Sequence, residues 1–246
     1  MMSDLIAAEW LKLRTTRLLA GIIPAAIAIS VAAVAGAILV HEGGGTALES
    51  SESVRRVLSV SGAGAILVLV TGIIISAGEH RDLTAGDTFL TTPRRHRVLA
   101  AKLIVGAALG LAVGVVTSLA STGVAAVIYR SRGARFPFTD AEVWLTLAGS
   151  LVYTALFAII GVSLGSLIRN QVFAVTGALA WFAVVEHTLV NFAPGVGRWL
   201  PAAAGQAIVR TPLEGLLPPA AGASLLAMYT AVAAWSGIRA VATRDT

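Results

Sequence analysis

The chain has 246 residues, of which 57% are hydrophobic and only 13% are charged. A soluble domain carries about 25% charged residues, so this chain has too few ions to cover a water-facing surface and is predicted to be an integral membrane protein. The absence of cysteine excludes disulfides and thiolate chemistry, and the net charge of +5 forms no basic patch interleaved with aromatic residues, so nucleic acid is not an expected partner.

Residues 1–17 predict an amphipathic helix on the membrane surface. Its apolar positions recur at helical spacing, and a tryptophan is the residue type favoured at headgroup depth. The apolar positions are Leu5, Ile6, Trp10 and Leu13, and the basic positions are Lys12, Arg14 and Arg17. The alternative is an ordinary basic flank that sets the topology. In either case Trp10, Lys12, Arg14 and Arg17 are expected to anchor the chain at the membrane surface.

Six apolar runs are each long enough to cross a bilayer as a helix. They are predicted at residues 18–40, 58–77, 103–128, 143–168, 172–190 and 220–241. Only residues 169–171 separate the fourth run from the fifth, so a buried helical hairpin is an alternative to the fifth span. Cleavage of the first run as a signal peptide is not expected, because Asp4 and Glu9 precede it and it is longer than the usual signal core of about 7–15 residues.

The distribution of Lys and Arg predicts that both termini of a six-span, all-α protein face the cytoplasm. In that orientation eleven of the 18 basic residues lie inside: Lys12, Arg14, Arg17, Arg81, Arg94, Arg95, Arg97, Lys102, Arg169, Arg239 and Arg244. The other seven, on the outside, are Arg55, Arg56, Arg130, Arg132, Arg135, Arg198 and Arg210. The expected location is the cell membrane, with residues 242–246 as a cytoplasmic tail.

Residues 191–219 are predicted to form a long outer segment. The segment is apolar and contains repeated proline and glycine, and its middle part, AAAGQAIV, is too short to cross a bilayer. Two structures fit this pattern. It is either a broken re-entrant helix that enters the membrane or an ordered outer loop.

Residues 78–102, GEHRDLTAGDTFLTTPRRHRVLAAK, form an ion-rich cytoplasmic loop in this topology. Thr84 is a candidate cap of a short helix, with Asp87 three residues later, and Pro93 ends that element. The second half of the loop, residues 93–102, is explained as the start of the third span. Its basic residues are expected to hold it at the lipid headgroups; they are Arg94, Arg95, Arg97 and Lys102. The mixed charges of the first half are typical of a surface that docks on a partner protein.

Three stretches of the chain resemble the permease subunits of type-2 ATP-binding-cassette exporters. They are AEWLKLRTTR before the first span, the loop just described, and SLIRNQVFA after the fourth span. The matching positions are Glu9, Trp10, Lys12, Glu79, Thr84, Thr92, Pro93, Arg97, Ala101 and Lys102. The sequence departs from the family pattern where Ala85 and Gly86 follow Thr84, since the family often has a glycine directly before this threonine.

The resemblance implies a dimer of six-span subunits that exports its substrate with a separate cytoplasmic ATPase, on which ATP and Mg are bound. It implies that the loop is a coupling helix on that ATPase, with contacts at Glu79, Arg81, Asp82, Thr84, Asp87 and Thr92, and that the N-terminal helix packs beside it. No cofactor is expected on this chain. Neither lysine lies in a phosphate-binding G-x-x-x-x-G-K-[ST] motif, which agrees with a motor on another chain.

Two rows of glycine predict close helix packing. Gly106, Gly110 and Gly114 share one face of the third span, and Gly161 and Gly165 share one face of the fourth. Such faces let helix backbones approach closely, either inside one subunit or across a dimer.

Glu186 is predicted near the outer boundary of the membrane. It is either a residue of the transport pathway or an interfacial acid beside His187 or Arg198. No catalytic or metal-binding residues are expected. The GVSLG stretch around Ser163 matches a serine nucleophile pattern, but Ser163 and His187 are offset by about 15 Å along their spans, too far for a catalytic hydrogen bond. An ion-coupled secondary transporter and a non-transporting membrane scaffold or regulator remain the alternative functions.

Overall fold

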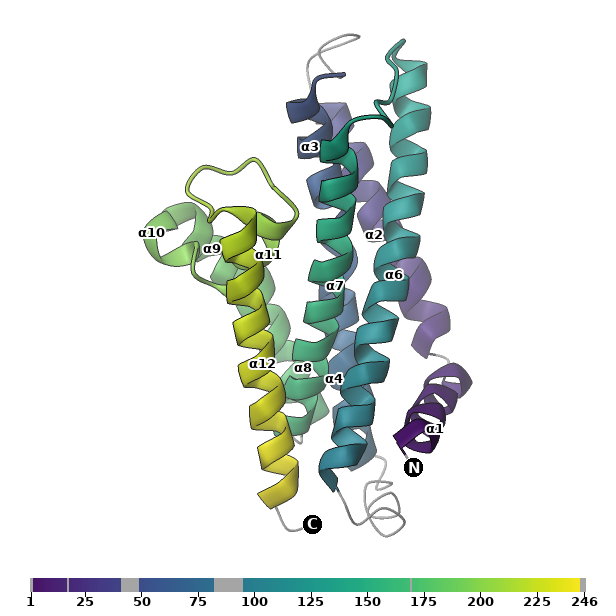
Figure 1. Cartoon of the computed structure of the whole chain (residues 1–246), viewed down its shortest axis with the longest axis vertical. Coiled ribbons are helices and arrows are strands. Elements are labelled where there is room, and N and C mark those ends of the chain that lie inside the picture. Colours follow the sequence, from purple (N-terminus) through teal and green to yellow (C-terminus); the bar gives the residue numbers. More distant parts are fainter. Residues whose placement is uncertain (1, 17, 41–48, 82–94, 169, 244–246) are drawn as a thin grey trace.

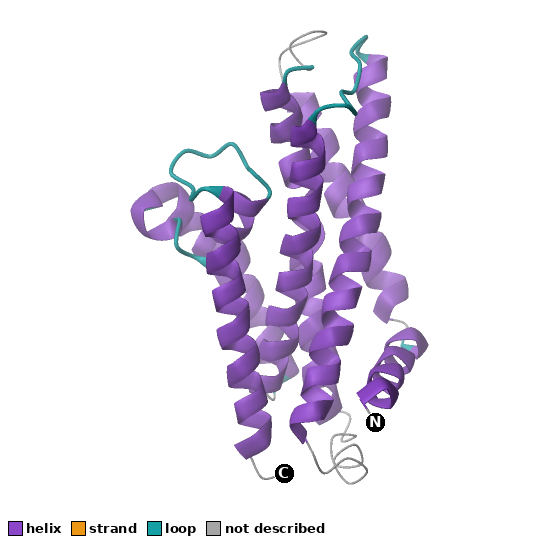
Figure 2. Ribbon diagram, viewed as in Figure 1, coloured by secondary structure: helices purple, strands orange, loops and turns teal. Residues whose placement is uncertain are grey.

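The computed structural model describes residues 2–16, 18–40, 49–81, 95–168 and 170–243, and it describes residues 79–81 and 95 by their backbone alone. Within these ranges the regular structure is helical and no strand occurs (Figure 2). The helices form an elongated bundle with both ends of the chain at the same end of the bundle (Figure 1). The predicted all-α class is therefore confirmed.

The helices follow one another with few irregular connections. In chain order they are α1 (Met2–Thr15), α2 (Leu18–Val40), α3 (Ser51–Ser59), the 3₁₀ helix η2 (Val60–Gly64), α4 (Ala65–Arg81), α6 (Arg95–Ser131), α7 (Ala141–Leu167), α8 (Gln171–Leu179), the π-helix η3 (Ala180–Val185), α9 (Glu186–Phe192), α10 (Pro194–Gly197), α11 (Pro201–Ile208) and α12 (Pro219–Thr243).

Six helical stretches of the described chain are long and apolar enough to cross a membrane, which agrees with the six predicted spans. They are Leu18–Val40, Ser51–Gly78, His96–Ser131, Ala141–Leu167, Gln171–Phe192 and Pro219–Thr243. The second begins seven residues before the predicted start at residue 58. The reason is the amphipathic α3, which buries Val54 and Val57 but exposes Glu52 and Arg56, so its average hydropathy is low although its helix continues into the span.

Side-chain caps set the starts of several of these helices. The Asp140 carboxylate accepts a hydrogen bond from the Glu142 N–H at the start of α7, at 2.9 Å. The Asn170 side chain does the same for the Phe173 N–H at the start of α8, at 3.0 Å. These bonds satisfy amide groups that have no partner inside a first helical turn.

Helix α7 is the central element of the bundle. It packs against α4, α6 and α12, whereas α2 and α1 pack against α6 (Figure 1). Many large apolar side chains outside these contacts are exposed, among them Leu119, Val127, Val172 and Phe173. This is the expected arrangement where lipid, not water, surrounds the bundle.

The segment after α9 folds back into the bundle. Helix α11 packs on α7 and α12 and buries Ala203, Ala204 and Ala207. The Gly149 position of α7 lies against the Ile208 carbonyl, about 12 Å along α7 from its first residue at a rise of about 1.5 Å per residue. Protein therefore covers the backbone at the end of α11, while the re-entrant helix and the ordered outer loop both stay predictions.

Candidate functional site

The helix ends that flank the predicted coupling loop lie at the end of the bundle that carries both termini (Figure 1). Helix α4 ends at Arg81 and α6 begins at Arg95. Glu79 and Arg81 belong to the last turn of α4, and Arg95 opens α6. The remaining loop positions, Asp82, Thr84, Asp87, Thr92 and Arg94, lie outside the described residues, as does Arg17.

A buried ion pair joins α1 to α6 at this end. Lys102 Nζ donates to Glu9 Oε2 at 2.6 Å, and both side chains are only 5% exposed. The second carboxylate oxygen, Glu9 Oε1, accepts from Lys12 Nζ at 3.0 Å. Each oxygen of the buried carboxylate therefore has its own ammonium group, which offsets the cost of removing these charges from solvent.

Apolar contacts hold α1 in the position that this ion pair requires. Ile6 and Leu13 pack with Val105 and Leu109 of α6. Glu9 lies between them on the same face of α1, three residues after Ile6 and four before Leu13. The carboxylate is thus enclosed by apolar side chains on both sides and directed at α6.

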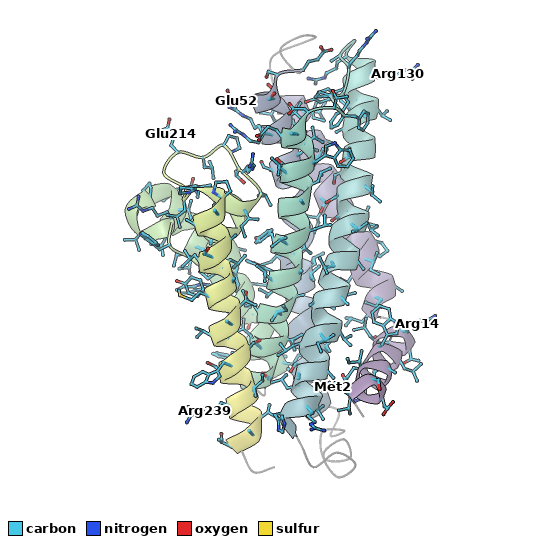
Figure 3. All side chains as sticks on the ribbon, viewed as in Figure 1. Met2, Arg14, Glu52, Arg130, Glu214 and Arg239 are labelled. Atoms are coloured by element: carbon cyan, nitrogen blue, oxygen red, sulfur yellow. The ribbon has the colours of Figure 1, made fainter. Side chains whose placement is uncertain are left out.

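The prediction that Lys102 anchors the chain at lipid headgroups is wrong. Its side chain is buried and directed at Glu9, so it cannot reach the headgroup layer. Trp10, predicted on the same face as Leu13, is instead 39% exposed beside the buried Glu9. Arg14 is exposed and projects away from the bundle (Figure 3), and Arg97 is partly exposed, so anchoring by Trp10, Lys12, Arg14 and Arg97 stays a prediction.

The α1–α6 contact is the feature that sequence reasoning missed. In the sequence, Glu9 belongs to the stretch that resembles the family and is not predicted to be buried. The available signal was an acid on the apolar stripe of α1, because a charge at such a position requires a buried partner or a different helix orientation.

The glycine row of α6 faces α7 of the same chain. A Cβ on Gly106 would come within 2.9 Å of Val162 Cγ2, and one on Gly110 within 2.7 Å of Ala155 Cα. Gly114 is one turn further along the same contact, where a Cβ would lie 3.2 Å from a backbone atom of α7. These positions let the two backbones approach more closely than side chains would allow.

The glycine row of α7 faces α4. A Cβ on Gly161 would overlap the Leu69 carbonyl, and one on Gly165 would lie 2.5 Å from the Ile73 carbonyl oxygen. Both rows are therefore occupied by contacts within one protomer, and together they pack α6, α7 and α4 into one unit.

Glu186 is fully buried where the fifth span meets α11. Its Oε1 accepts from Trp181 Nε1 at 2.7 Å, and its Oε2 accepts from the Ala202 N–H, in the first turn of α11, at 2.6 Å. The π-helical turn between Trp181 and Glu186 explains the first contact, because residues five apart on an α-helix point in different directions. The carboxylate also lies at the positive end of the α11 dipole.

These partners differ from the neighbours predicted for Glu186. The carboxylate is enclosed by protein and bonded to Trp181 and Ala202, not to His187 or Arg198, and its depth in the membrane stays a prediction. A role in the pathway stays a prediction. Among the described residues, no group of three or more His, Asp or Glu lies close enough to hold a metal ion.

A comparison with known protein families gives a match that covers α1 and most of the candidate spans. The model of the family described as "ABC-2 family transporter protein" matches residues 5–185, from α1 through most of the fifth candidate span. Among curated proteins, none matches the sequence. The matched range covers well over half of the chain and includes both Glu9 and Lys102. The chain therefore belongs to the ABC-2 transporter family and is a multi-pass membrane protein of the permease type.

Proposed function

We propose that the chain is the membrane subunit of an ATP-driven exporter. Two such subunits form the pathway between them, and a separate ATPase subunit binds and hydrolyses ATP. Both termini and the 78–102 loop face the cytoplasm of a cell membrane. Family membership supports the permease role, and the resemblance of the loop to a coupling helix supports the ATPase contact.

The Glu9–Lys102 ion pair is the observation that carries this proposal. Lys102 lies seven residues after the start of α6, about 10 Å along the helix. A displacement of the loop would therefore act on α6 and, through the ion pair, on α1. The close contact at Gly110 would pass the same displacement to α7. The arrangement can transmit a mechanical step and needs no covalent chemistry on this chain.

A pull-down from detergent-solubilised membranes of the source cells tests the ATPase contact. We expect a nucleotide-binding subunit to accompany the tagged wild-type chain and to be lost when Glu79→Gln, Arg81→Gln and Asp82→Asn are combined. The matched control combines Glu52→Gln with Arg56→Gln, an exposed ion pair at the opposite end of the bundle.

Two results would contradict the proposal. One is a wild-type chain that brings down no nucleotide-binding subunit. The other is a subunit that binds the triple variant and the control equally well. Transport that follows an ion gradient and ignores ATP would instead favour a secondary transporter.

A further inference from the structure

We propose that a cavity at the end of the bundle opposite both termini binds an anionic amphiphile, a molecule with one negatively charged head and an aliphatic chain. The cavity has a volume of about 450 Å³, within the range of about 300–1,000 Å³ typical of ligand sites. It lies between α3, the end of α11 and the connection from α11 to α12. The residues that line it include Arg55, Arg210, Thr211, Leu213, Leu216 and Leu217.

The two arginines of the cavity differ in how they are paired. Arg210 Nη1 donates to both carboxylate oxygens of Glu142, at 2.7 Å each. The Nε of Arg55 is buried and has no hydrogen-bond partner among the described residues. A buried guanidinium donor without an acceptor is unfavourable, so an anion in the cavity would supply what Arg55 lacks.

Two acids on the elements around the cavity, Asp140 and Glu52, are paired with groups other than Arg55. Asp140 accepts from Ser51 Oγ at 2.6 Å and from the Glu142 N–H, and these bonds hold the pKa of Asp140 below its ordinary value. Glu52 pairs with Arg56, and Glu214 points away from the bundle (Figure 3). Neither Asp140 nor Glu52 bonds to Arg55, whose Nε has no acceptor among the described residues.

The backbone of Arg210 has an uncommon conformation. Its φ angle is +57°, in the left-handed region, and it occupies the position after the α11 cap where glycine is usual. The Thr211 N–H donates to the Gln206 carbonyl and the Arg210 N–H to the Ala207 carbonyl, the hydrogen-bond pair of a Schellman ending. An arginine at this position is strained, and the side chain that it supplies there is the one bonded to Glu142, so Arg210 forms a fixed part of the cavity wall.

Apart from the two arginines and Thr211, the side chains that line the cavity are apolar. Leu213, Leu216 and Leu217 come from the connection between α11 and α12, and Leu213 is 44% exposed although it lines the cavity. A small inorganic anion would leave these side chains uncovered, and a cationic head would be repelled by Arg55. An anionic head with an aliphatic chain satisfies both parts of the wall. That such a molecule is the exported cargo rests on the proposed function, whereas the binding site itself does not.

Equilibrium binding to the purified full chain, in nanodiscs of phosphatidylcholine with empty nanodiscs as the blank, tests the site. The probe is labelled dodecyl phosphate. We expect saturable binding, weakened about 10- to 100-fold by Arg55→Gln, the factor for a hydrogen bond to a charged group. Arg56→Gln is the matched control, since Arg56 is the next residue of α3, is not part of the cavity wall and should bind like the wild type.

Competition separates the possible ligand classes. Inorganic phosphate should compete poorly, and dodecyltrimethylammonium should not compete. Equal affinity of Arg55→Gln and Arg56→Gln would overturn the proposal, as would inorganic phosphate that competes as well as dodecyl phosphate. If Arg55→Gln does not fold, Leu213→Gln tests the site instead. Leu213 is partly exposed, so a polar residue should be tolerated there, and binding of dodecyl phosphate should still weaken. Binding of dodecyl phosphate is measured without any ATPase. A negative binding result would therefore contradict the proposed site and leave the pull-down test of the ATPase contact unaffected.

Discussion

The buried carboxylate of Glu9 pairs with two lysines, and these differ strongly in their exposure to solvent. Lys102 is 5% exposed and lies 93 residues away in the chain, whereas Lys12 is 48% exposed and lies on the same helix. Exposed ion pairs contribute at most about 1 kcal/mol, whereas removing one partner of a buried pair costs about 3–5 kcal/mol. The two lysines therefore form a matched pair for testing which contact holds α1.

We expect Lys102→Ala to lower the free energy of unfolding by about 3 kcal/mol or more, because it leaves the Glu9 carboxylate buried with one partner fewer. Lys12→Ala should lower it by less than about 1 kcal/mol. Titration of the detergent-solubilised protein with SDS measures both. Equal effects of the two substitutions would show that the Glu9–Lys102 pair does not hold α1. Combining Lys102→Met with Glu9→Gln should recover part of the loss.

At the scale of helices, α7 is held by backbone contact on one side and by a folded-back helix on another. Gly161 and Gly165 lie against α4, and Gly149 lies against the end of α11. Helices that touch through backbone leave no room for an added methyl group, so their spacing is sensitive to single atoms. The glycine pattern could be seen in the sequence, but the partner of each row could not, because every span offers similar apolar surface.

Gly161→Ala should destabilise the protein by about 2 kcal/mol or more, since the new Cβ would overlap the Leu69 carbonyl and force α4 and α7 apart. Gly123→Ala in α6 is the control. A Cβ there meets nothing within 4 Å, so it should be neutral or stabilise by up to about 1 kcal/mol through helix propensity. Thermal unfolding in detergent measures both, and a harmless Gly161→Ala would refute the close approach.

Glu186 is expected to hold α11 in place through the Ala202 N–H. Glu186→Ala should therefore expose α11, and a cysteine placed at the buried Ala203 should react with maleimide about 10- to 100-fold faster. The chain has no native cysteine, so the label reports this position alone. His187→Ala, an exposed neighbour, is the control and should leave the rate unchanged. If the rate in Glu186→Ala stays at the control value, the carboxylate does not hold the helix.

For the molecule as a whole, the two ends of the bundle carry different chemistry. One end of the bundle carries both termini (Figure 1), the α1–α6 ion pair and the helix ends that flank the predicted coupling loop. The arginine-lined cavity lies beside α3 and the connection from α11 to α12. An exporter of the proposed kind would take up energy at the first end and release its cargo at the second. The orientation in the membrane decides whether this assignment holds.

Single cysteines and a membrane-impermeant maleimide test the orientation in intact cells. We expect labelling at Ser131→Cys and Glu214→Cys and none at Ser3→Cys or Thr243→Cys, because the excess of Lys and Arg predicts that both termini face the cytoplasm. Permeabilised cells should label all four positions. The reverse pattern in intact cells would invert the topology and remove the proposed ATPase contact.

The sequence by itself determined the all-α class, the six spans and the family, since each depends on local information. A run of about 20 apolar residues predicts a span without reference to the rest of the chain, and the family motifs are short stretches in a fixed order. Only the tertiary structure decided that Lys102 is buried against Glu9, that α11 folds back onto α7, and that Arg55 faces a cavity with Arg210. Each of these three contacts joins segments that are far apart in the chain. Which segments meet is decided by tertiary packing, and local hydropathy does not encode it.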